Sequence, residues 1–295
     1  MAELSPVGMI GLGLMGEAFS GLLRKAGYPV VGTDIDPAKA AKLAALGGQW
    51  ADSAADVARD CPVIVLIVFN TDQVEAVLER EILAAVGESS GKIVLCASTC
   101  DPDRIAALGA RVAPRGIRLL ETPVSGTSDQ VRKHEGVGLI GGDAALMAAV
   151  KPVLDAIYAK HFHIGAIGDG GRAKLAINLI LGVNRAALAE GLVFAERLGL
   201  DPARFLAVAR TSAAYSQVMD TKGDKMVRGD FSPQGMVQVT HKDASLMLEQ
   251  AAKAGQQLPL LSVHHELLAG CIRNGQGQLD NSSVIEEVRR RRGDD

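Results

Sequence analysis

Six residues near the start of the chain have the spacing of a phosphate-binding turn. Glycines stand at positions 11, 13 and 16, after an apolar run and before an amphipathic segment. In a strand–turn–helix unit, the first glycine permits a tight turn, the second lets the backbone approach a diphosphate, and the third lets the helix pack on the strand. The diphosphate then lies at the positive end of the helix dipole. We therefore expect a dinucleotide to bind at Gly11, Leu12, Gly13, Leu14, Met15 and Gly16.

An acidic residue follows this turn at the distance that a dinucleotide site requires. Asp34 stands 18 residues after Gly16, at the end of a second apolar run. A carboxylate there accepts hydrogen bonds from the ribose hydroxyls of adenosine and repels a 2′-phosphate. The next residue is Ile35, where NADP enzymes commonly have Arg. We expect NAD as the cofactor, with NADP less favoured. The alternative is a glycine turn with an Asp that caps a helix before Pro37.

A lysine lies in apolar surroundings in the second half of the chain. Lys174 stands within Ala173–Ile177, and Asn178 follows four residues later, on the same face of a helix. An idle charge in an apolar segment is unfavourable, and burial or a nearby positive charge lowers the pKa of a lysine toward neutrality. Such an amine can move a hydroxyl proton while the carbon is oxidised or reduced. The alternative is a lysine whose amine reaches solvent from a helix end, although the helix dipole opposes a positive charge there.

The first half of the chain alternates short apolar runs with segments of helical periodicity. We expect strands at Val7–Ile10, Pro29–Thr33, Val63–Val68, Ile93–Cys96, Arg118–Thr122 and Val137–Ile140. We expect helices between them at Leu14–Lys25, Ala38–Leu46, Thr71–Leu83 and Asp103–Val112. This order predicts βαβ units with right-handed crossovers, and hence an α/β domain with a doubly wound, mostly parallel sheet of the Rossmann type.

The second half of the chain is richer in helical signals. Residues 170–198 are mostly Ala, Leu, Ile, Val and Gly, which predicts a helix of about 43 Å that is buried between other elements. Further helices are expected at Pro202–Arg210, Gln217–Val227, Thr240–Ala254 and Pro259–Asn274, and no strand after about His163. We expect an NAD-binding Rossmann domain at 1–165. An all-helical substrate and dimerisation domain at 166–295 would begin with the long connecting helix.

Several motifs occur in the same order as in a known family. They are Ile10–Gly16, Thr122–Gly126, Gly168–Lys174, Asn178 and the pair Lys242–Asp243. With them the chain resembles the β-hydroxyacid dehydrogenases, which include 3-hydroxyisobutyrate dehydrogenase, tartronate semialdehyde reductase and L-threonate dehydrogenase. The resemblance extends from Val7 to about Val288. It implies a fold like that of 6-phosphogluconate dehydrogenase.

For the substrate, the resemblance implies one catalytic residue and four binding residues. Lys174 would be the general acid/base, and Asn178 would hold the substrate. Ser125, Gly126 and Thr127 would bind the substrate carboxylate through hydroxyl and backbone groups. The residues themselves allow this role, because a turn after a strand exposes N–H groups that suit an anion. The alternative for Ser125 and Gly126 is an ordinary turn at the end of a strand.

For the cofactor, the resemblance adds residues beyond the glycine turn. Thr99 and the backbone of Val68 and Phe69 would line the nicotinamide ribose, and Lys242 would approach the nicotinamide end from the helical domain. The alternative for Lys242 is an ion pair on its own helix, with Asp243 or Glu249.

Some positions depart from the usual family pattern. Ile177 stands where many members have Asn, Thr127 where a second Gly is usual, and Phe69 where Pro is common. The segment Gln130–His134 is more basic than usual. The resemblance therefore predicts a reaction type without naming the acid that is oxidised.

We accordingly expect reversible, NAD-dependent oxidation of the primary alcohol of a small 3-hydroxy acid to its semialdehyde. Two alternatives remain open. Imine reductases share this architecture, but they usually lack a lysine at the position of Lys174. A dinucleotide-binding module without catalysis would have no need to keep both Lys174 and Asn178.

Composition bears on partners and location. The chain has 295 residues, 48% of them hydrophobic, and a formal net charge of -3, which argues against a nucleic-acid surface. Apolar runs such as Val63–Phe69 are far shorter than the roughly 20 residues of a membrane helix. The N-terminus lacks the basic and apolar pattern of a signal peptide. We expect a cytoplasmic protein that binds a small carboxylate substrate, with neither nucleic acid nor a membrane as a partner. The long apolar helix suggests a homodimer or homotetramer.

Cysteines and histidines do not form a metal-binding pattern. The four cysteines lack paired spacing, which favours reduced thiols: Cys61, Cys96, Cys100 and Cys271. The clustered histidines have no matching cysteine or acidic cluster nearby in the sequence: His161, His163, His264 and His265. We therefore expect no metal site.

Overall fold

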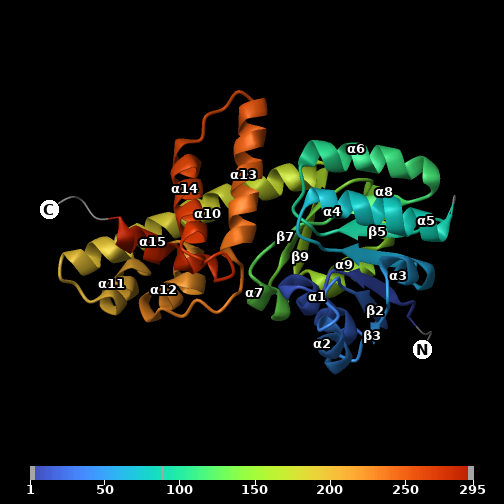
Figure 1. Cartoon of the computed structure of the whole chain (residues 1–295), viewed down its shortest axis with the longest axis horizontal. Coiled ribbons are helices and arrows are strands. Elements are labelled where there is room, and N and C mark those ends of the chain that lie inside the picture. The colour runs from blue at the N-terminus through green and yellow to red at the C-terminus, as the bar shows by residue number, and fades with distance from the viewer. Residues whose placement is uncertain (1–3, 88–89, 292–295) are drawn as a thin grey trace. The chain divides into compact units, whose positions relative to one another are not determined.

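The computed structural model describes residues 4–87 and 90–291. The chain forms two compact units, Met1–Lys174 and Leu175–Asp295. In Figure 1 the first unit is coloured from blue to green, and the second from yellow to red. The boundary falls inside the long helix, a little beyond the domain boundary expected at residue 165.

The first unit is built on one twisted sheet with the strand order β3-β2-β1-β4-β5-β6-β8-β7, in which β9 also pairs with β8. The pairs from β3 through β6 are parallel, β8 runs antiparallel to β6 and β7, and β9 is parallel to β8. The strands are β1 (Val7–Ile10), β2 (Val30–Thr33), β3 (Gln49–Trp50), β4 (Val63–Leu66), β5 (Ile93–Cys96), β6 (Arg118–Glu121), β7 (Val124–Ser125), β8 (Val137–Gly141) and β9 (Lys160–Gly165).

Helices cover both faces of this sheet (Figure 1). They are α1 (Leu14–Lys25), α2 (Lys39–Ala45), α3 (Ala54–Asp60), α4 (Thr71–Ala76), α5 (Leu83–Val86), α6 (Pro102–Val112), α7 (Ser128–Arg132), α8 (Ala144–Ala149) and α9 (Lys151–Ile157). Between α4 and α5 the chain continues as a π-helical turn, Val77–Ile82. A short 3₁₀ turn, Ala113–Arg115, follows α6.

Alternate residues of the strands supply two separate cores. Val65 packs in the cluster that contains Phe19 of α1, whereas Ile64 packs in the cluster that contains Val57 of α3 and Ile105 of α6. This period of two explains why the parallel strands read as continuous apolar runs: both of their faces are buried.

The position of β1 decides where a ligand can bind. β1 lies between β2 and β4, so the chain crosses over to one side of β1 first and to the other side later. In doubly wound sheets, the loops that follow the strands separate at such a switch point and leave a crevice at the carboxyl edge. The glycine turn follows β1 at this edge, which confirms the expected Rossmann-type fold.

The second unit consists of helices within the described residues. They are the C-terminal part of α10 (Asp169–Arg197), then α11 (Pro202–Ala209), α12 (Asp224–Arg228), α13 (Val237–Lys253), α14 (Pro259–Arg273) and α15 (Val284–Arg290), with a π-helical turn at Met219–Gly223 and a 3₁₀ turn at Asn281–Ser283. Their shared core includes Leu192 of α10, Leu206 of α11 and Leu268 of α14. This is the all-helical arrangement that the sequence predicts.

The expectation that α10 is buried on most sides is wrong. Its core-facing residues Leu188 and Leu192 are almost fully buried, but Ile180 is 61% exposed and Phe194 is 65% exposed. Both faces are apolar, so composition alone cannot tell the packed face from the open one. Among the described residues, α10 is also the one helix long and apolar enough to cross a membrane. Its buried Arg185 and its place in the helical core identify it instead as a packed helix.

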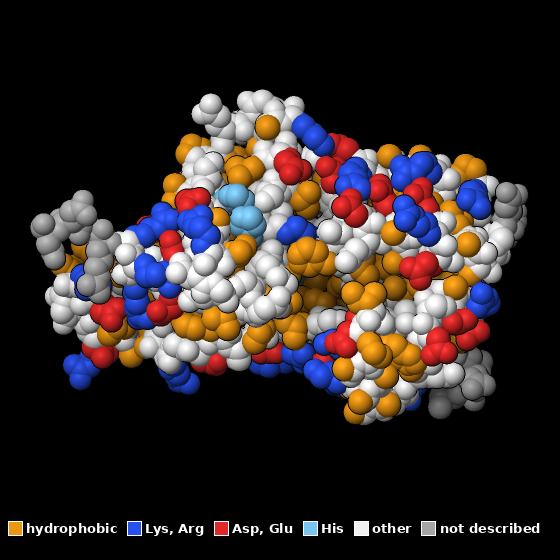
Figure 2. All heavy atoms as spheres, in the orientation of Figure 1, with side chains coloured by type: hydrophobic (Ala, Val, Ile, Leu, Met, Phe, Trp, Pro, Cys, Tyr) orange, Lys and Arg blue, Asp and Glu red, His pale blue; other side chains and the backbone are white. Residues whose placement is uncertain are grey.

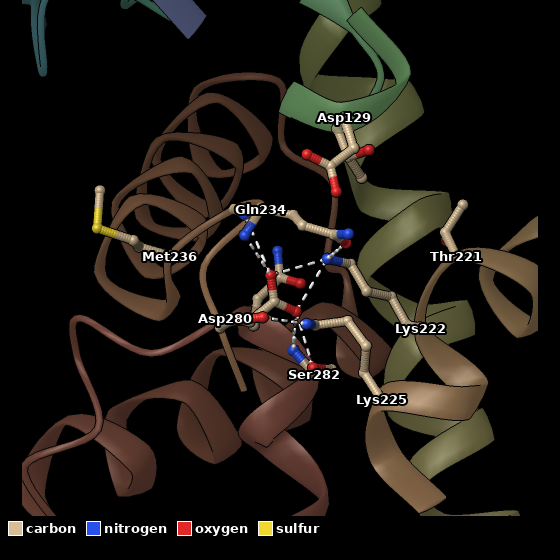
Figure 3. A network of polar contacts seen from close by, with 12 residues as sticks. Asp129, Thr221, Lys222, Lys225, Gln234, Met236, Asp280 and Ser282 are labelled. Atoms are coloured by element: carbon tan, nitrogen blue, oxygen red, sulfur yellow. Dashed lines mark hydrogen bonds and ion pairs between the residues drawn. The ribbon is translucent and has the colours of Figure 1, made fainter. Parts of the chain in front are cut away.

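A buried ion pair joins two segments of the second unit, the π-helical turn and the stretch before α15 (Figure 3). Lys222 Nζ lies 2.8 Å from Asp280 Oδ2, and both side chains are shielded from solvent. The Asp280 carboxylate also accepts hydrogen bonds from the amides of Gln234, Gly235 and Ser282. With this many donors, the carboxylate stays ionised although it is buried: its pKa is below the usual value because Lys222 and these donors outweigh desolvation.

Candidate active site

The glycine turn has the backbone geometry of a diphosphate cradle. Gly11 has φ of +93°, and a Cβ at Gly16 would lie 1.9 Å from the Gly11 carbonyl oxygen, so only glycine fits at either position. At Gly13, in contrast, an added Cβ would meet no described atom within 4 Å. Gly13 is the N-cap of α1, and a group that reaches it meets the positive end of that helix. The open side of Gly13 therefore fits a diphosphate.

Asp34 lies directly after β2, beside this turn. Its Oδ2 accepts a hydrogen bond of 2.6 Å from the Leu12 amide, and its Oδ1 accepts one of 2.9 Å from the Asp36 amide. The carboxylate is thus fixed to the glycine turn itself, next to Ile35, which is 96% exposed. A carboxylate held at this position can accept hydrogen bonds from a ribose.

The residues expected to line the nicotinamide ribose follow the next two strands. Val68 and Phe69 come after β4, and Thr99 comes after β5, at the same carboxyl edge as the glycine turn. The Val68 amide donates to Ser98 Oγ at 2.8 Å, and the Phe69 amide donates to Gln73 Oε1 at 2.8 Å. Side chains thereby fix the backbone of this loop. Contact of these residues with a ribose stays a prediction.

The turn after β7 carries the residues expected to bind the substrate carboxylate. Gly126 has φ of +140°, which only glycine adopts readily, and Ser125 is half-buried beside it. Thr127 is the N-cap of α7: its hydroxyl accepts from the Gln130 amide, and its own amide donates to Gln130 Oε1 at 2.9 Å. This capping box uses both polar groups of Thr127. In this structure the Ser125 hydroxyl and the backbone at Gly126 are therefore better placed to meet an anion than Thr127.

Lys174 lies in the second turn of α10, at the end of the first unit, and is only 7% exposed. The turn begins at Gly168, whose φ is +104°, and continues through Gly170 and Gly171. Gly141 of β8 approaches closely, since a Cβ at Gly170 would lie 3.0 Å from its amide nitrogen. The glycine-rich start lets the helix approach the sheet closely, and Lys174 is consequently buried.

Asn178 and Lys242 meet the same carboxylate within the second unit. Asn178 Nδ2 donates to Asp243 Oδ2 at 3.2 Å, and Lys242 Nζ lies 2.9 Å from Asp243 Oδ1. Asp243 is 6% exposed. The ion pair expected as the alternative for Lys242 is therefore present. Asp243 turns the amide of Asn178 so that its Nδ2 faces the carboxylate and its oxygen is directed elsewhere.

The cysteines and histidines that could bind a metal ion have other partners or lie apart from one another. All four cysteines are free and buried, with Cys96 Sγ and Cys100 Sγ 4.0 Å apart. His161 Nε2 lies 2.8 Å from Asp155 Oδ1, and His163 Nε2 lies 2.8 Å from the Gly142 carbonyl. Within the described ranges, no group of three or more histidine, cysteine or acidic side chains is arranged to hold a metal ion.

Two family models together match nearly the whole chain. Residues 6–165 match the NAD-binding domain of 6-phosphogluconate dehydrogenase. Residues 168–288 match the NAD-binding domain of NADP-dependent 3-hydroxyisobutyrate dehydrogenase. The chain belongs to the β-hydroxyacid dehydrogenase family.

Individual relatives match this chain over nearly its full length. The chain is 32% identical to an L-threonate dehydrogenase of Cupriavidus necator and covers 95% of each chain. It is 31% identical to a 2-hydroxy-3-oxopropionate reductase of Escherichia coli, over 96% of each. A solved 3-hydroxyisobutyrate dehydrogenase from Salmonella typhimurium superposes with a TM-score of 0.88 at 29% identity, and the match covers 96% of this chain and 99% of that one.

Family membership confirms the expected class of activity: this β-hydroxyacid dehydrogenase is an oxidoreductase of hydroxy acids with a nicotinamide dinucleotide site.

Two residues near the candidate site were given no role in the sequence analysis. Asp243 was visible only as the neighbour of Lys242, and Glu121 only as a residue within the expected strand Arg118–Thr122. Their contacts with Asn178 and with the start of α10 depend on segments distant in sequence, which no local pattern reveals.

Proposed function

We propose that the protein catalyses the reversible, NAD-dependent oxidation of the primary alcohol of a small 3-hydroxy acid to its semialdehyde. The observation that carries this proposal is the buried amine of Lys174, one helical turn before Asn178 on α10. When bound, the nicotinamide dinucleotide accepts or supplies the hydride. The protein must then remove or deliver the hydroxyl proton, and a poorly solvated lysine is suited to that task.

Each residue of the proposal has a separate task. Lys174 accepts the hydroxyl proton during oxidation and returns it during reduction. Ser125 and the backbone at Gly126 bind the substrate carboxylate, and Asn178, held by Asp243, orients the substrate through its amide. The substrate names of the relatives, L-threonate and 2-hydroxy-3-oxopropionate, support a short polar acid.

NAD, in preference to NADP, is supported by Asp34. A carboxylate fixed by two backbone amides cannot turn away from a 2′-phosphate, and the adjacent Ile35 offers no positive charge to bind one. One matching family model describes an NADP-dependent enzyme, which points the other way. Asp34 is the stronger support, because a carboxylate directly after the second strand of such a unit is the usual partner of the adenosine ribose.

Two further proposals concern the cellular compartment and the oligomeric state of the enzyme. Four buried, unpaired thiols support a reducing compartment and hence the cytoplasm. Exposed apolar side chains of the helical unit support a homodimer or homotetramer, since surfaces of this kind are usually covered: Ile180, Phe194, Leu260 and Val263. Figure 2 shows hydrophobic side chains of this kind, in orange, on the visible face.

The decisive experiment measures turnover of a substrate panel. Hydroxyisobutyrate, glycerate, threonate and serine are each tested with NAD and with NADP by absorbance of the reduced nucleotide. We expect turnover of at least one acid, faster with NAD. Lys174→Ala is expected to lower kcat by about 10²–10⁴-fold with unchanged dinucleotide affinity. Lys151→Ala removes an exposed lysine of the same unit and serves as the control. Tight NADH binding without turnover of any acid would indicate a binding module instead.

A further inference from the structure

A buried carboxylate at the end of β6 lies against the first turn of α10. Glu121 is 3% exposed and is the last residue of the strand. Its Oε2 accepts a hydrogen bond from the Gly168 amide, and the Gly171 amide also donates to its carboxylate. Both donors belong to the N-terminus of the helix that carries Lys174, where the helix dipole favours a negative charge.

The surrounding backbone is shaped to fit this carboxylate. A Cβ at Gly141 of β8 would lie 2.7 Å from Glu121 Oε2, and a Cβ at Gly171 would lie 2.8 Å from Oε1. At Gly170 a Cβ would lie 3.4 Å from the Cβ of Glu121 and closer still to the backbone of β8. Larger residues at these positions would displace the carboxylate or the helix. The close approach of α10 to the sheet therefore depends on glycine at several positions around one side chain.

The same strand leads directly to the turn that is proposed to bind the substrate. Ser125 stands four positions after Glu121, and Lys174 stands three positions after Gly171. A tie between Glu121 and the start of α10 thus fixes, within one unit, the two segments that carry the carboxylate-binding hydroxyl and the amine. A misplacement of about 1 Å in such a pair can lower a rate by about 10²-fold.

We propose that Glu121 is a positioning residue for catalysis: its ionised carboxylate fastens the start of α10 to β6 and thereby sets the place of Lys174 relative to Ser125. This proposal rests on the proposed role of Lys174. Ionisation matters because a carboxylate can accept from both amides, whereas a protonated carboxyl must use one oxygen as a donor.

The charged groups around Glu121 do not neutralise it. On α10, Arg172 pairs instead with Asp169 at 2.9 Å and with Asp103 at 3.0 Å. On β5, the register partner of Glu121 is Cys96, a buried thiol. Burial therefore raises the pKa of Glu121 to about 7, opposed by the amides of Gly168 and Gly171 and by Arg172, and reinforced by Asp169. The carboxyl then changes its charge near neutral pH.

Glu121→Gln is the direct test, because the amide keeps the shape and removes the charge. With the acid from the panel that the wild-type enzyme turns over fastest, we expect kcat to fall at least tenfold, while the Kd for NADH stays within twofold. Wild-type kcat should rise as the pH increases through about 7, where Glu121 ionises. In Glu121→Gln that step should be absent.

A matched control and a second variant keep the result interpretable. Glu79→Gln makes the same change at an exposed ion pair with Arg111 in the same unit and should alter neither kcat nor the pH profile. If Glu121→Gln does not fold, Gly171→Ala retains the charge but crowds Oε1, and the same loss of kcat with intact NADH binding is expected. Wild-type kcat and an unchanged pH profile in the folded variants would overturn the proposal.

Hydrogen exchange separates this proposal from the proposed function. Amide exchange of the segment that spans Gly168–Leu175, corrected for intrinsic rates, should be faster in Glu121→Gln than in the wild type at pH 8 and not in Glu79→Gln. If the wild-type enzyme turns over no acid, the proposed function fails, yet faster exchange would still support the tie. Equal exchange in all three proteins would disprove the tie even if the enzyme is active.

Discussion

At the scale of single residues, the two carboxylates Asp34 and Glu121 are used in opposite ways. Asp34 is half-buried at the surface of the cradle and is held by two amides so that one face stays available to a ligand. Glu121 is enclosed, and all of its contacts are internal. The first carboxylate is suited to ligand recognition and the second to positioning, although both lie at the carboxyl end of a strand, at the same edge of the sheet.

Removal of the Asp34 carboxylate should change the choice of cofactor. Hydrogen bonds to a charged group contribute about 1.5–3 kcal/mol, so Asp34→Ala should weaken NADH binding by about 10- to 100-fold. NADPH should lose much less, because its 2′-phosphate no longer meets a negative charge. Fluorescence titration with both nucleotides measures this. Asp36→Ala, which changes a carboxylate on the same loop, is the control. Equal affinity of the wild-type protein for both nucleotides would contradict this role of Asp34.

A buried histidine of α14 should make the second unit sensitive to acid. Burial, with Arg185 and His265 nearby, lowers the pKa of His264 to about 3. Below pH 6.5 this histidine binds a proton in the unfolded chain but not in the folded chain. Its contribution to the free energy of unfolding is therefore fully present above pH 6.5 and is lost as the pH falls toward 3. At pH 4.5 this loss is about 2–3 kcal/mol.

Denaturation by urea at pH 7 and pH 4.5 tests the effect of His264. His264→Gln should lose clearly less stability between the two pH values than the wild type does. His163→Gln, at an exposed position of β9, should behave like the wild type. An equal or steeper loss in His264→Gln than in the wild type would show that this histidine is not the acid-sensitive group.

At the scale of helices and strands, the buried pair of Lys222 and Asp280 connects the π-helical turn to the segment before α15. Asp280→Ala would leave a buried ammonium without its carboxylate and strip several amides of their acceptor, at a cost of about 3–5 kcal/mol in unfolding free energy. Thermal or urea denaturation measures the loss. Asp230→Ala removes an exposed carboxylate that pairs with Lys225 in the same unit and should lower the melting temperature far less than Asp280→Ala does.

The same scale shows what the sequence could and could not predict. β1, β5 and α1 match their expected bounds, because apolar runs with clear ends and a glycine turn mark them. β3 and β7 have two residues each, too few for any period to appear, and the short helices α3, α7, α8 and α9 were not expected. The segment Thr71–Leu83 was expected as one regular helix, but from Val77 to Ile82 it is a π-helical turn, which a period of 3.6 residues does not predict.

In the candidate site, too, features that depend on neighbouring residues could be predicted, and contacts between distant segments could not. The glycine turn and Asp34 could be predicted because their function depends on residues close in sequence. Lys174 and Asn178 could be predicted because they lie one helical turn apart in an apolar segment and match the motif of the family. The contacts of Asp243 and Glu121 join segments far apart in the chain, 65 residues in the first case and 47 in the second. Such contacts are known only once the fold is known.

At the scale of the whole molecule, the open face of α10 should be covered by a second copy. Phe194→Glu places a charge on a side chain that is 65% exposed in the single chain, so a monomer would tolerate it. An oligomer that buries this face would dissociate. Light scattering after size exclusion measures the mass, and Arg204→Glu, on the neighbouring helix α11, is the control for added charge. A wild-type protein with the mass of one chain at micromolar concentration would rule out the oligomer.

The helix α10 belongs to both units, and this has a thermodynamic consequence. In a continuous α-helix the amides of residues 175–178 donate to the carbonyls of residues 171–174, so the turn that carries Lys174 is completed by the next turn of α10 itself. Melting of the second unit removes those donors and frays that turn, even if the nucleotide cradle stays intact. On heating, turnover should therefore disappear with whichever unit melts first, whereas nucleotide binding should persist until the sheet itself unfolds.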